Sequence, residues 1–432
     1  MTRLASIAVA ALLAIGAPMA PLAPAQTVGA TTPEPAPTFT AEQWREDLDQ
    51  LVRELPEKHL NAFSRRSRDD FEAQAAKLRA DLDAMTDTDR ALALSRLVAS
   101  LGDGHTMIDI TPYQVASPLF PIGLMPASDG FLIAAAPSSS PEMLGCELVA
   151  INDVPMAEVL DRLATLYSWE NRATKEARLR QWLAMGEAHR FLGITPSAEE
   201  ATVSFRALEP GAPIQTAVIA GVPRADMGVH VTPLSRPTPG VAELSRRRDN
   251  RAMWFDFVPG EPIMYLRYDR CADDRQMSIR QYTDSVLLRL DAGGVERLII
   301  DLRANGGGNS ALLNPFINAL AKRPVFKERG SLIVLTGRDT YSSAQLNADA
   351  LRRNAGAVVI GGPTGQKPNA YGEVRSFTLK NTGLPVYYST KFFKTDQDDP
   401  ESMMPDVLIE PTMADLAAGR DVVLEAAVEF KP

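Results

Sequence analysis

The sequence predicts an α/β protein whose main sheet is rich in parallel strands and covered by helices. In the last part of the chain, short apolar runs alternate with longer segments of helical periodicity. Consecutive strand–helix units of this kind usually form a parallel sheet with helices packed on it. The expected strands lie at 253–257, 263–268, 298–300, 332–335 and 357–360, and the expected helices at 276–290, 342–354 and 421–430.

The composition is that of a globular protein without an obvious cofactor. The 432 residues are enough for two or three domains, and 45% are hydrophobic and 23% charged. The net charge of −9 argues against nucleic acid or an anionic membrane as a partner, because both attract basic surfaces. The four histidines have no close spacing and no paired Cys/His motif, so we predict no metal and no other cofactor.

Residues 1–25 have the features of a secretory signal peptide. Arg3 precedes an apolar stretch at 4–17, and an Ala-Pro-Ala cleavage site follows at 23–25. The apolar stretch is too short to span a membrane, and no later stretch reaches about 18 apolar residues. We therefore expect secretion, most simply to a bacterial periplasm, with no integral membrane segment after cleavage. Residues 26–39, rich in Pro, Thr and Ala, are interpreted as a disordered linker.

The two cysteines could form a disulfide in an oxidising compartment. Cys146 and Cys271 each lie in an apolar, strand-like setting, and nothing in the sequence brings them together. We interpret them as buried free thiols.

Residues 40–110 are predicted to form an N-terminal helical domain. Thr40 begins a capping box, Ser67 precedes a second helical pattern, and Gly102 ends a third. His59, at the end of the first helix, is interpreted as a structural histidine.

Residues 111–238 are predicted to form a middle domain that looks PDZ-like. Residues 145–155 have the pattern of a strand and a turn, and a helical pattern follows at 157–160. PDZ modules bind an extended peptide as an added strand. A helical insert at about 174–191 interrupts the pattern, so peptide capture is a weaker inference than the fold.

The rest of the chain is organised around residues 298–345. Three glycines, 306–308, follow a buried strand, and Ser342 and Ser343 lie where another strand gives way to a helix. A serine at such a position is most often an N-cap. Alternatively, Ser342 is a nucleophile and the glycine turn supplies an oxyanion hole.

Three motifs in order favour the second interpretation. Asp-Leu-Arg-x-Asn-x-Gly-Gly at 301–308, a serine at the start of a helix, and Gly-x-Pro-Thr-x-x-Lys at 361–367 resemble the C-terminal processing (tail-specific) serine peptidases. The resemblance covers about residues 250–430. It implies a crotonase/ClpP-like core for the predicted catalytic domain, residues 239–432. An Asp-Gly-His-Thr turn at 103–106 resembles the tricorn-type branch of the same group, in which a histidine takes the serine's proton.

Two residues could act as the base for Ser342. His105 has a reference pKa near neutrality, whereas Lys367 would need burial to lose its charge. Tail-specific relatives have a glutamate three residues after the serine, where this chain has Gln345. In the histidine branch a late acid completes the set, and Asp399 is the candidate, with Glu401 as the alternative.

The resemblance further implies oxyanion donors at the backbone N–H groups of Gly307 and Ser343. We prefer His105 to Lys367 as the base. The leading hypothesis is an exported serine peptidase acting on peptides or unfolded proteins. The alternatives are a catalytically weak or inactive protein that binds peptides or apolar ligands on the same scaffold, and a non-peptidase acyl hydrolase.

Overall fold

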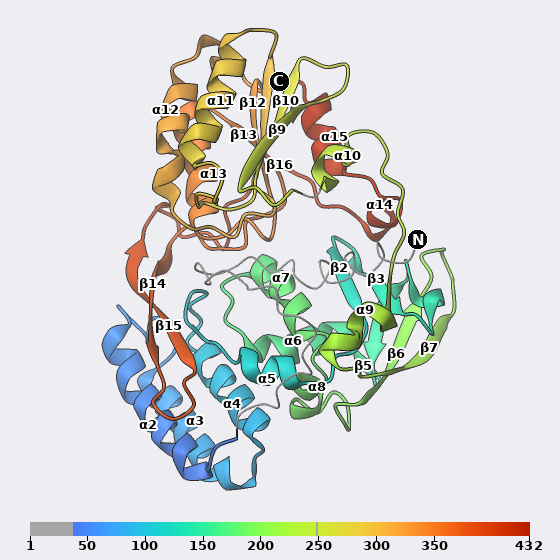
Figure 1. Cartoon of the computed structure of the whole chain (residues 1–432), viewed down its shortest axis with the longest axis vertical. Coiled ribbons are helices and arrows are strands. Elements are labelled where there is room, and N and C mark those ends of the chain that lie inside the picture. The colour runs from blue at the N-terminus through green and yellow to red at the C-terminus, as the bar shows by residue number, and fades with distance from the viewer. Residues whose placement is uncertain (1–37, 248) are drawn as a thin grey trace.

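The computed structural model describes residues 38–247 and 249–432. The predicted signal peptide and nearly all of the predicted linker lie outside the described residues. The described residues form three sheets of six, seven and three strands, which lie at the top, lower right and left of Figure 1.

The six-stranded sheet confirms the predicted parallel-rich architecture. Its order is β16 (Val407–Leu408), β13 (Val358–Gly361), β12 (Leu332–Thr336), β11 (Arg297–Asp301), β10 (Ile263–Tyr268) and β9 (Met253–Phe257). Every neighbouring pair is parallel except β9 with β10. Successive residues of the central strands are buried on opposite faces, so both faces need covering.

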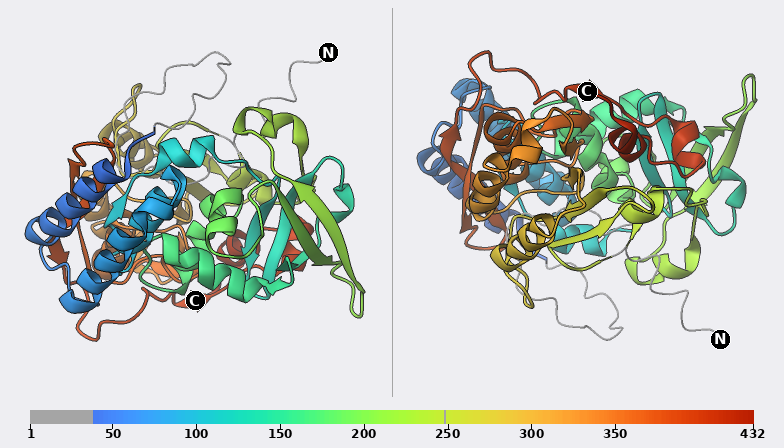
Figure 2. Two further views of the ribbon diagram at one scale, coloured as in Figure 1. Left: turned by 90° about the horizontal axis from the view of Figure 1, so that it is seen from below. Right: turned by 90° about the horizontal axis from the view of Figure 1, so that it is seen from above.

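Helices cover both faces of this sheet (Figures 1 and 2). One face packs on α11 (Ile279–Asp291), α12 (Asn314–Ala321) and α13 (Ser343–Ala355). The other face packs on α10 (Ala242–Arg246) and α15 (Val422–Glu429). The carboxyl ends of β11 and β12 therefore emerge from a sheet that is covered on both faces, and they point towards the rest of the molecule.

Of the three N-terminal helices, the first two begin at the predicted caps Thr40 and Ser67, whereas the third begins after Thr86 and ends at Ala99, before the predicted Gly102. They are α2 (Ala41–Lys58), α3 (Arg68–Asp81) and α4 (Asp87–Ala99). The Thr40 side chain accepts a hydrogen bond from the N–H of Gln43 in a capping box, and the Ser67 side chain caps α3.

A hairpin from the far end of the sequence packs on these helices (Figure 1). It consists of β14 (Ala370–Thr378) and β15 (Pro385–Phe393), and β15 also pairs with the short β1 (Met107–Ile108). Leu384 and Val386 belong to the same buried cluster as Trp44. Part of the segment predicted as the catalytic domain thus completes the core of the N-terminal region.

The middle region contains the seven-stranded sheet and its helices. The strands are β2 (Gly123–Ala127), β3 (Gly130–Pro137), β4 (Glu147–Ile151), β5 (Val154–Pro155), β6 (Glu200–Arg206), β7 (Ile214–Ala220) and β8 (Val231–Pro233). The helices are α5 (Thr111–Ala116), α6 (Met156–Leu163), α7 (Arg172–Trp182), α8 (Gly186–Phe191) and α9 (Met227–His230), and α14 (Met413–Ala417) packs on β2 and β3. The predicted insert at 174–191 corresponds to α7 and α8.

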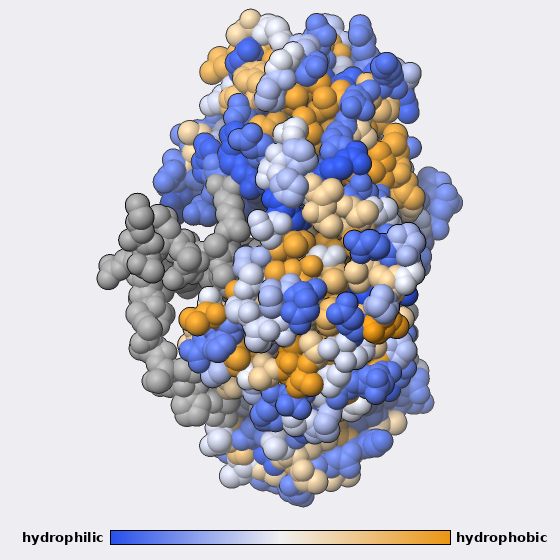
Figure 3. All heavy atoms as spheres, turned by 90° about the vertical axis from the view of Figure 1, so that its right-hand side faces the viewer, coloured by the Kyte–Doolittle hydropathy of each residue, from blue (hydrophilic) through white to orange (hydrophobic). Residues whose placement is uncertain are grey.

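Both cysteines are buried and free, as the sequence predicts. In the part of the chain that the structure describes, no helix combines the length and apolar content needed to cross a membrane. The face shown in Figure 3 is a mosaic of hydrophilic and hydrophobic residues.

The hairpin depends on one buried carboxylate for its tip. Asp47, on α2 and fully buried, accepts hydrogen bonds from the backbone N–H groups of Asn381 (2.9 Å) and Thr382 (2.8 Å) and from the Thr382 hydroxyl (2.7 Å). We expect Asp47→Ala to lower the free energy of unfolding by about 2–4 kcal/mol, because buried donors lose their acceptor. Urea unfolding followed by circular dichroism measures this change.

Asp49→Ala is the matched control. Asp49 lies on the same helix as Asp47, but it is half-exposed and pairs with Arg79 on α3. Its removal is expected to change the free energy of unfolding by less than about 0.5 kcal/mol. Equal effects of the two substitutions would contradict the role assigned to Asp47.

Candidate active site

Ser342 occupies a strained junction between β12 and α13. Its φ is +54°, a region that a serine rarely adopts. It lies at the N-cap position of α13, but its side chain makes no capping hydrogen bond. The Ser342 Oγ atom lies instead 3.1 Å from Nε2 of His105. The N-cap interpretation of this serine is therefore wrong, and the backbone strain is located at the residue whose hydroxyl contacts the imidazole.

His105 lies in a buried turn between α4 and β1. It is 4% exposed, and burial lowers its pKa to about 4, against the opposing effect of the Asp103 charge. The imidazole is therefore neutral near pH 7. A neutral Nε2 can accept the Ser342 proton without first losing one of its own.

Asp103 holds this turn in place. Its carboxylate accepts hydrogen bonds from the His105 backbone N–H (3.0 Å), from the Ser389 hydroxyl (2.7 Å) and from Nε2 of His59 (2.9 Å). Burial alone would raise the pKa of Asp103, but the hydrogen bonds from His59 and from the Thr106 and Ser389 hydroxyls hold it well below its usual range.

His59 has the structural role that the sequence predicts. Its Nδ1 accepts from the backbone N–H of Asn61 (2.9 Å), so Nε2 carries the hydrogen that it donates to Asp103. Ser389 belongs to β15, and the hairpin therefore helps to hold the histidine turn.

The glycine turn lies directly against Ser342. Gly307 has φ +107°, and a Cβ at this residue would lie 2.6 Å from Cβ of Ser342 and 3.0 Å from the backbone nitrogen of Ser343. Only a glycine allows this approach.

The hydrogen bonds of the glycine turn show which of its peptide groups are already engaged. The carbonyl of Gly307 accepts from the N–H of Cys271 (2.9 Å), and the carbonyl of Gly308 accepts from the Ser343 hydroxyl (2.6 Å). Because a trans peptide has its N–H opposite its C=O, the N–H of Gly308 points away from Cys271. No acceptor among the described residues is found for the N–H of Gly308 or of Ser343.

The predicted donor Gly307 needs correcting. Its N–H donates to the Asn305 side-chain oxygen (2.9 Å), so it is already engaged within the turn. The N–H groups of Gly308 and Ser343, for which the described residues supply no acceptor, are the remaining candidates for oxyanion donors.

Asp301 and Arg303 fix the start of the turn. The Arg303 guanidinium bonds both the buried Asp301 (2.7 Å) and Asp421 (2.7 Å) on the way into α15. This network ties the end of β11 to the opposite side of the sheet and does not contact Ser342.

Lys367 is directed away from the serine. Its ammonium group pairs with Glu401 (3.2 Å) and Asp399 (3.3 Å), and no contact with Ser342 is found among the described residues. Asp399, predicted as the acid partner of His105, therefore binds the rival base instead. The structure brings Ser342, His105, Gly308 and Ser343 together and leaves Lys367 and Asp399 as a separate ion pair.

Gln345 explains part of this arrangement. Its oxygen accepts from the Thr364 hydroxyl (2.6 Å) and its nitrogen donates to the Lys367 carbonyl (3.1 Å). The neutral amide of Gln345 thus bonds both ends of the 364–367 turn, at the Thr364 hydroxyl and at the Lys367 carbonyl. It offers no negative charge to the Lys367 ammonium group.

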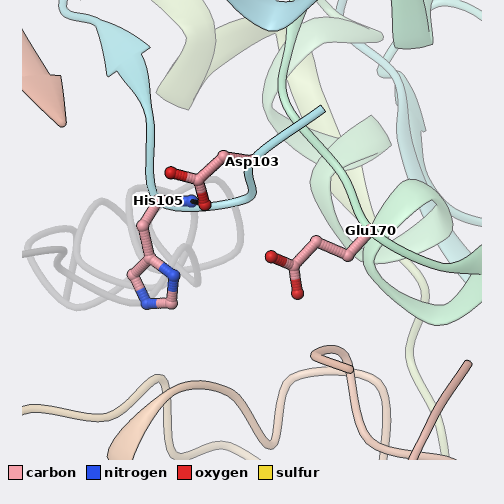
Figure 4. A group of neighbouring side chains, drawn as sticks. All are labelled: Asp103, His105 and Glu170. Carbon is pink, nitrogen blue, oxygen red and sulfur yellow. Dashed lines mark hydrogen bonds between the residues drawn. The ribbon is translucent and has the colours of Figure 1, made fainter. Parts of the chain in front are cut away.

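Sequence reasoning missed Glu170, which comes before α7. Its two oxygens accept from the backbone N–H groups of Gly104 and Lys367 (3.2 Å each). Burial, with the Asp103 charge adding to it, raises the pKa of Glu170 to about 7. In Figure 4 its carboxyl group points towards the side of the turn where Asp103 and His105 lie. No local motif marks this residue, since only the fold brings it to the site.

Asp103, His105 and Glu170 also have the spacing of a metal site. One ligand atom from each lies within 4.8 Å of the others. However, the Asp103 carboxylate bonds His59 and Ser389, and both oxygens of Glu170 accept backbone N–H groups. These lone pairs are engaged with the protein, so we describe the group as a hydrogen-bonded network.

A cavity of about 880 Å³ opens in front of Ser342. Apolar side chains on its wall are Leu312, Leu346, Val374 and Phe393. The space is large enough for several residues of an extended peptide.

Comparison with known proteins places this geometry in a known fold. No protein-family model and no curated protein sequence matches the chain. Mature CPAF complexed with lactacystin is similar over 90% of this chain and 98% of its own, with 14% identity and a TM-score of 0.59. The fold is that of the C-terminal processing serine peptidases. This confirms the resemblance predicted from the three motifs.

Two further solved structures are similar at lower scores. The photosystem II D1 C-terminal processing protease matches 91% of this chain and 100% of its own, with 15% identity and a TM-score of 0.40. The tricorn protease matches 90% of this chain and 36% of its own, with 13% identity and a TM-score of 0.42.

The close approach of Gly307 can be tested by substitution. We expect Gly307→Ala to reduce fluorophosphonate labelling of Ser342 about 100-fold, because the added Cβ must displace the serine. The measurement is the rate constant of labelling. Gly294→Ala is the control, since Gly294 also has a positive φ (+78°) but nothing within 4 Å of an added Cβ. Equal losses in both variants would show that backbone strain alone is responsible.

The burial of His105 predicts an unusual pH dependence. An imidazole accepts a proton from a serine only when it is neutral, and the His105 pKa of about 4 means that protonation comes well below the usual value near 6.5. We therefore expect labelling of Ser342 to continue at pH 5 and to disappear as the pH falls through about 4. Near-UV circular dichroism at each pH monitors folding. Half-loss of labelling near pH 6.5 in a folded protein would contradict this expectation.

Proposed function

We propose that the protein is an exported serine peptidase that hydrolyses peptide bonds through an acyl-enzyme. Ser342 is the nucleophile and His105 is the general base. The observation that supports this most directly is the 3.1 Å contact between Ser342 Oγ and His105 Nε2, beside two N–H groups for which the described residues supply no acceptor.

The chemistry follows from this geometry. Nε2 of the neutral imidazole accepts the Ser342 proton while Oγ forms a bond to the scissile carbonyl carbon. The resulting oxyanion accepts hydrogen bonds from the N–H groups of Gly308 and Ser343. Each such donor typically lowers the barrier by about 3 kcal/mol. The imidazolium then gives its proton to the leaving amine as the C–N bond breaks, and water hydrolyses the ester by the same steps.

The peptide substrate is supported by the space around the site. The 880 Å³ cavity accepts an extended chain, and its apolar wall suits apolar side chains. We further propose that the seven-stranded sheet is the PDZ-like module, with its edge strand β2 available to an extended peptide. Export follows from the predicted signal peptide at 1–25.

Three substitutions separate the candidate bases. We expect Ser342→Ala and His105→Ala to abolish hydrolysis of a denatured protein, since each removes a group that the reaction uses. Lys367→Ala is expected to keep kcat within about tenfold, because the Lys367 ammonium group pairs with Asp399 and Glu401 and not with the serine. The measurement is kcat on a fluorescent unfolded-protein substrate, together with fluorophosphonate labelling.

Each outcome assigns a role. If Lys367→Ala abolished kcat and His105→Ala did not, the lysine would be the base and the assignment to His105 would be refuted. An unlabelled, inactive wild-type protein that binds peptides equally well with and without Ser342 would favour a binding protein on the same scaffold.

A further inference from the structure

Tyr341, the residue before the nucleophile, contacts the face of the base that Ser342 does not reach. Its hydroxyl lies 3.4 Å from Nδ1 of His105, and its ring centroid lies 4.8 Å from that of His105 at an interplanar angle of 35°. If Nε2 accepts the Ser342 proton, Nδ1 must carry the hydrogen of the neutral ring. The phenolic oxygen is positioned to accept it.

We propose that Tyr341 is the residue that positions His105, by accepting the Nδ1–H hydrogen bond that a carboxylate accepts in a Ser-His-Asp triad. This rests on the proposed function of Ser342 and His105. It replaces the predicted acid Asp399, which is paired with Lys367.

The ring of Tyr341 is held rigidly. The Arg178 guanidinium lies 5.1 Å from the ring centroid and donates to the carbonyl of Gly104 (2.9 Å). The side chain is 7% exposed. The Tyr341 ring is thus packed between the Arg178 guanidinium and the His105 imidazole in a buried environment. This packing fixes the hydroxyl without a direct ion pair.

Gly104 is what makes room for the hydroxyl. A Cβ at residue 104 would lie 2.2 Å from the Tyr341 oxygen and 3.1 and 3.2 Å from Cγ and Cδ of Glu170. The Tyr341 hydroxyl and the Glu170 carboxyl group therefore share the small space that the missing side chain leaves. When it is ionised, the Glu170 carboxylate beside the hydroxyl favours the positive imidazolium that forms during the reaction.

Other groups face His105 and provide the rival explanation. Asp103 bonds the backbone N–H of His105 and not its ring, and Arg178 opposes a positive charge on the ring. The backbone of Tyr371, on β14, also faces the imidazole and favours its protonated form. If the Tyr371 carbonyl alone held Nδ1–H, the Tyr341 hydroxyl would be dispensable.

Tyr341→Phe in the full chain tests the proposal, because it removes one oxygen and keeps the ring. We expect kcat to fall at least about tenfold with KM unchanged. This loss corresponds to one hydrogen bond to a group that becomes charged. The labelling rate of Ser342 should fall in parallel. Tyr282→Phe is the matched control, since it removes a tyrosine hydroxyl bonded to Asp274 (3.0 Å) on α11.

A double-mutant cycle with Gly104→Ala makes the test specific. Alone, Gly104→Ala should lower kcat about as much as Tyr341→Phe, because its Cβ displaces the hydroxyl. In the Tyr341→Phe background it should cost little more, since the oxygen it collides with is absent. Additive losses, unchanged kcat in Tyr341→Phe, or a change in KM alone would each overturn the proposal.

The histidine tautomer gives a readout that needs no turnover. With four histidines in the sequence, ¹⁵N-histidine labelling can resolve the ring nitrogens of His105 by NMR. We expect Nδ1–H in the wild type and a tautomer mixture in Tyr341→Phe. An Nε2–H tautomer in the wild type would refute the proposal. Wild-type protein with the expected tautomer but no hydrolysis would refute only the proposed function.

Discussion

The approach of the glycine turn to Ser342 is the constraint on which the rest of the site depends. Two parallel strands, β11 and β12, end side by side, and the chain leaving each must occupy the same small space. Gly307 has no side chain, and Ser342 adopts a positive φ, so the two backbones come within van der Waals distance. The strain at Ser342 directs its Oγ away from the helix that it would otherwise cap. A rigid, doubly covered sheet is what allows this strain to persist.

The second requirement of the site is that a histidine from the N-terminal region lies beside a serine from the C-terminal region. The β14–β15 hairpin satisfies it, because it leaves the catalytic sheet, packs on α2 and pairs with β1. Its Ser389 bonds Asp103, whose carboxylate also fixes the backbone of His105. Buried polar groups joined in this way leave little freedom for the imidazole. The helical region thus contributes the imidazole that contacts Ser342 as well as a covering layer.

The sequence predicts what is encoded locally. Thr40, Ser67 and the alternating strands and helices follow from capping and periodicity, and the structure has them where expected. The motif around Ser342 predicts a serine at a helix entrance. Contacts between distant segments were not predictable in the same way. The pairing of Lys367 with Asp399, and the arrival of Glu170 at the turn, depend on loops whose positions only the whole fold determines.

The surroundings of the two side chains favour His105 over Lys367 as the base. Lys367 lies on a turn whose backbone is held by Gln345, and its ammonium group extends to two acids at the surface, Asp399 and Glu401. The Lys367 ammonium group is engaged in these two ion pairs, and no contact between it and Ser342 is found among the described residues. His105 is buried, and burial favours its neutral form. The replacement of an acid by Gln345 therefore agrees with a site in which the lysine is structural and the imidazole does the proton transfer.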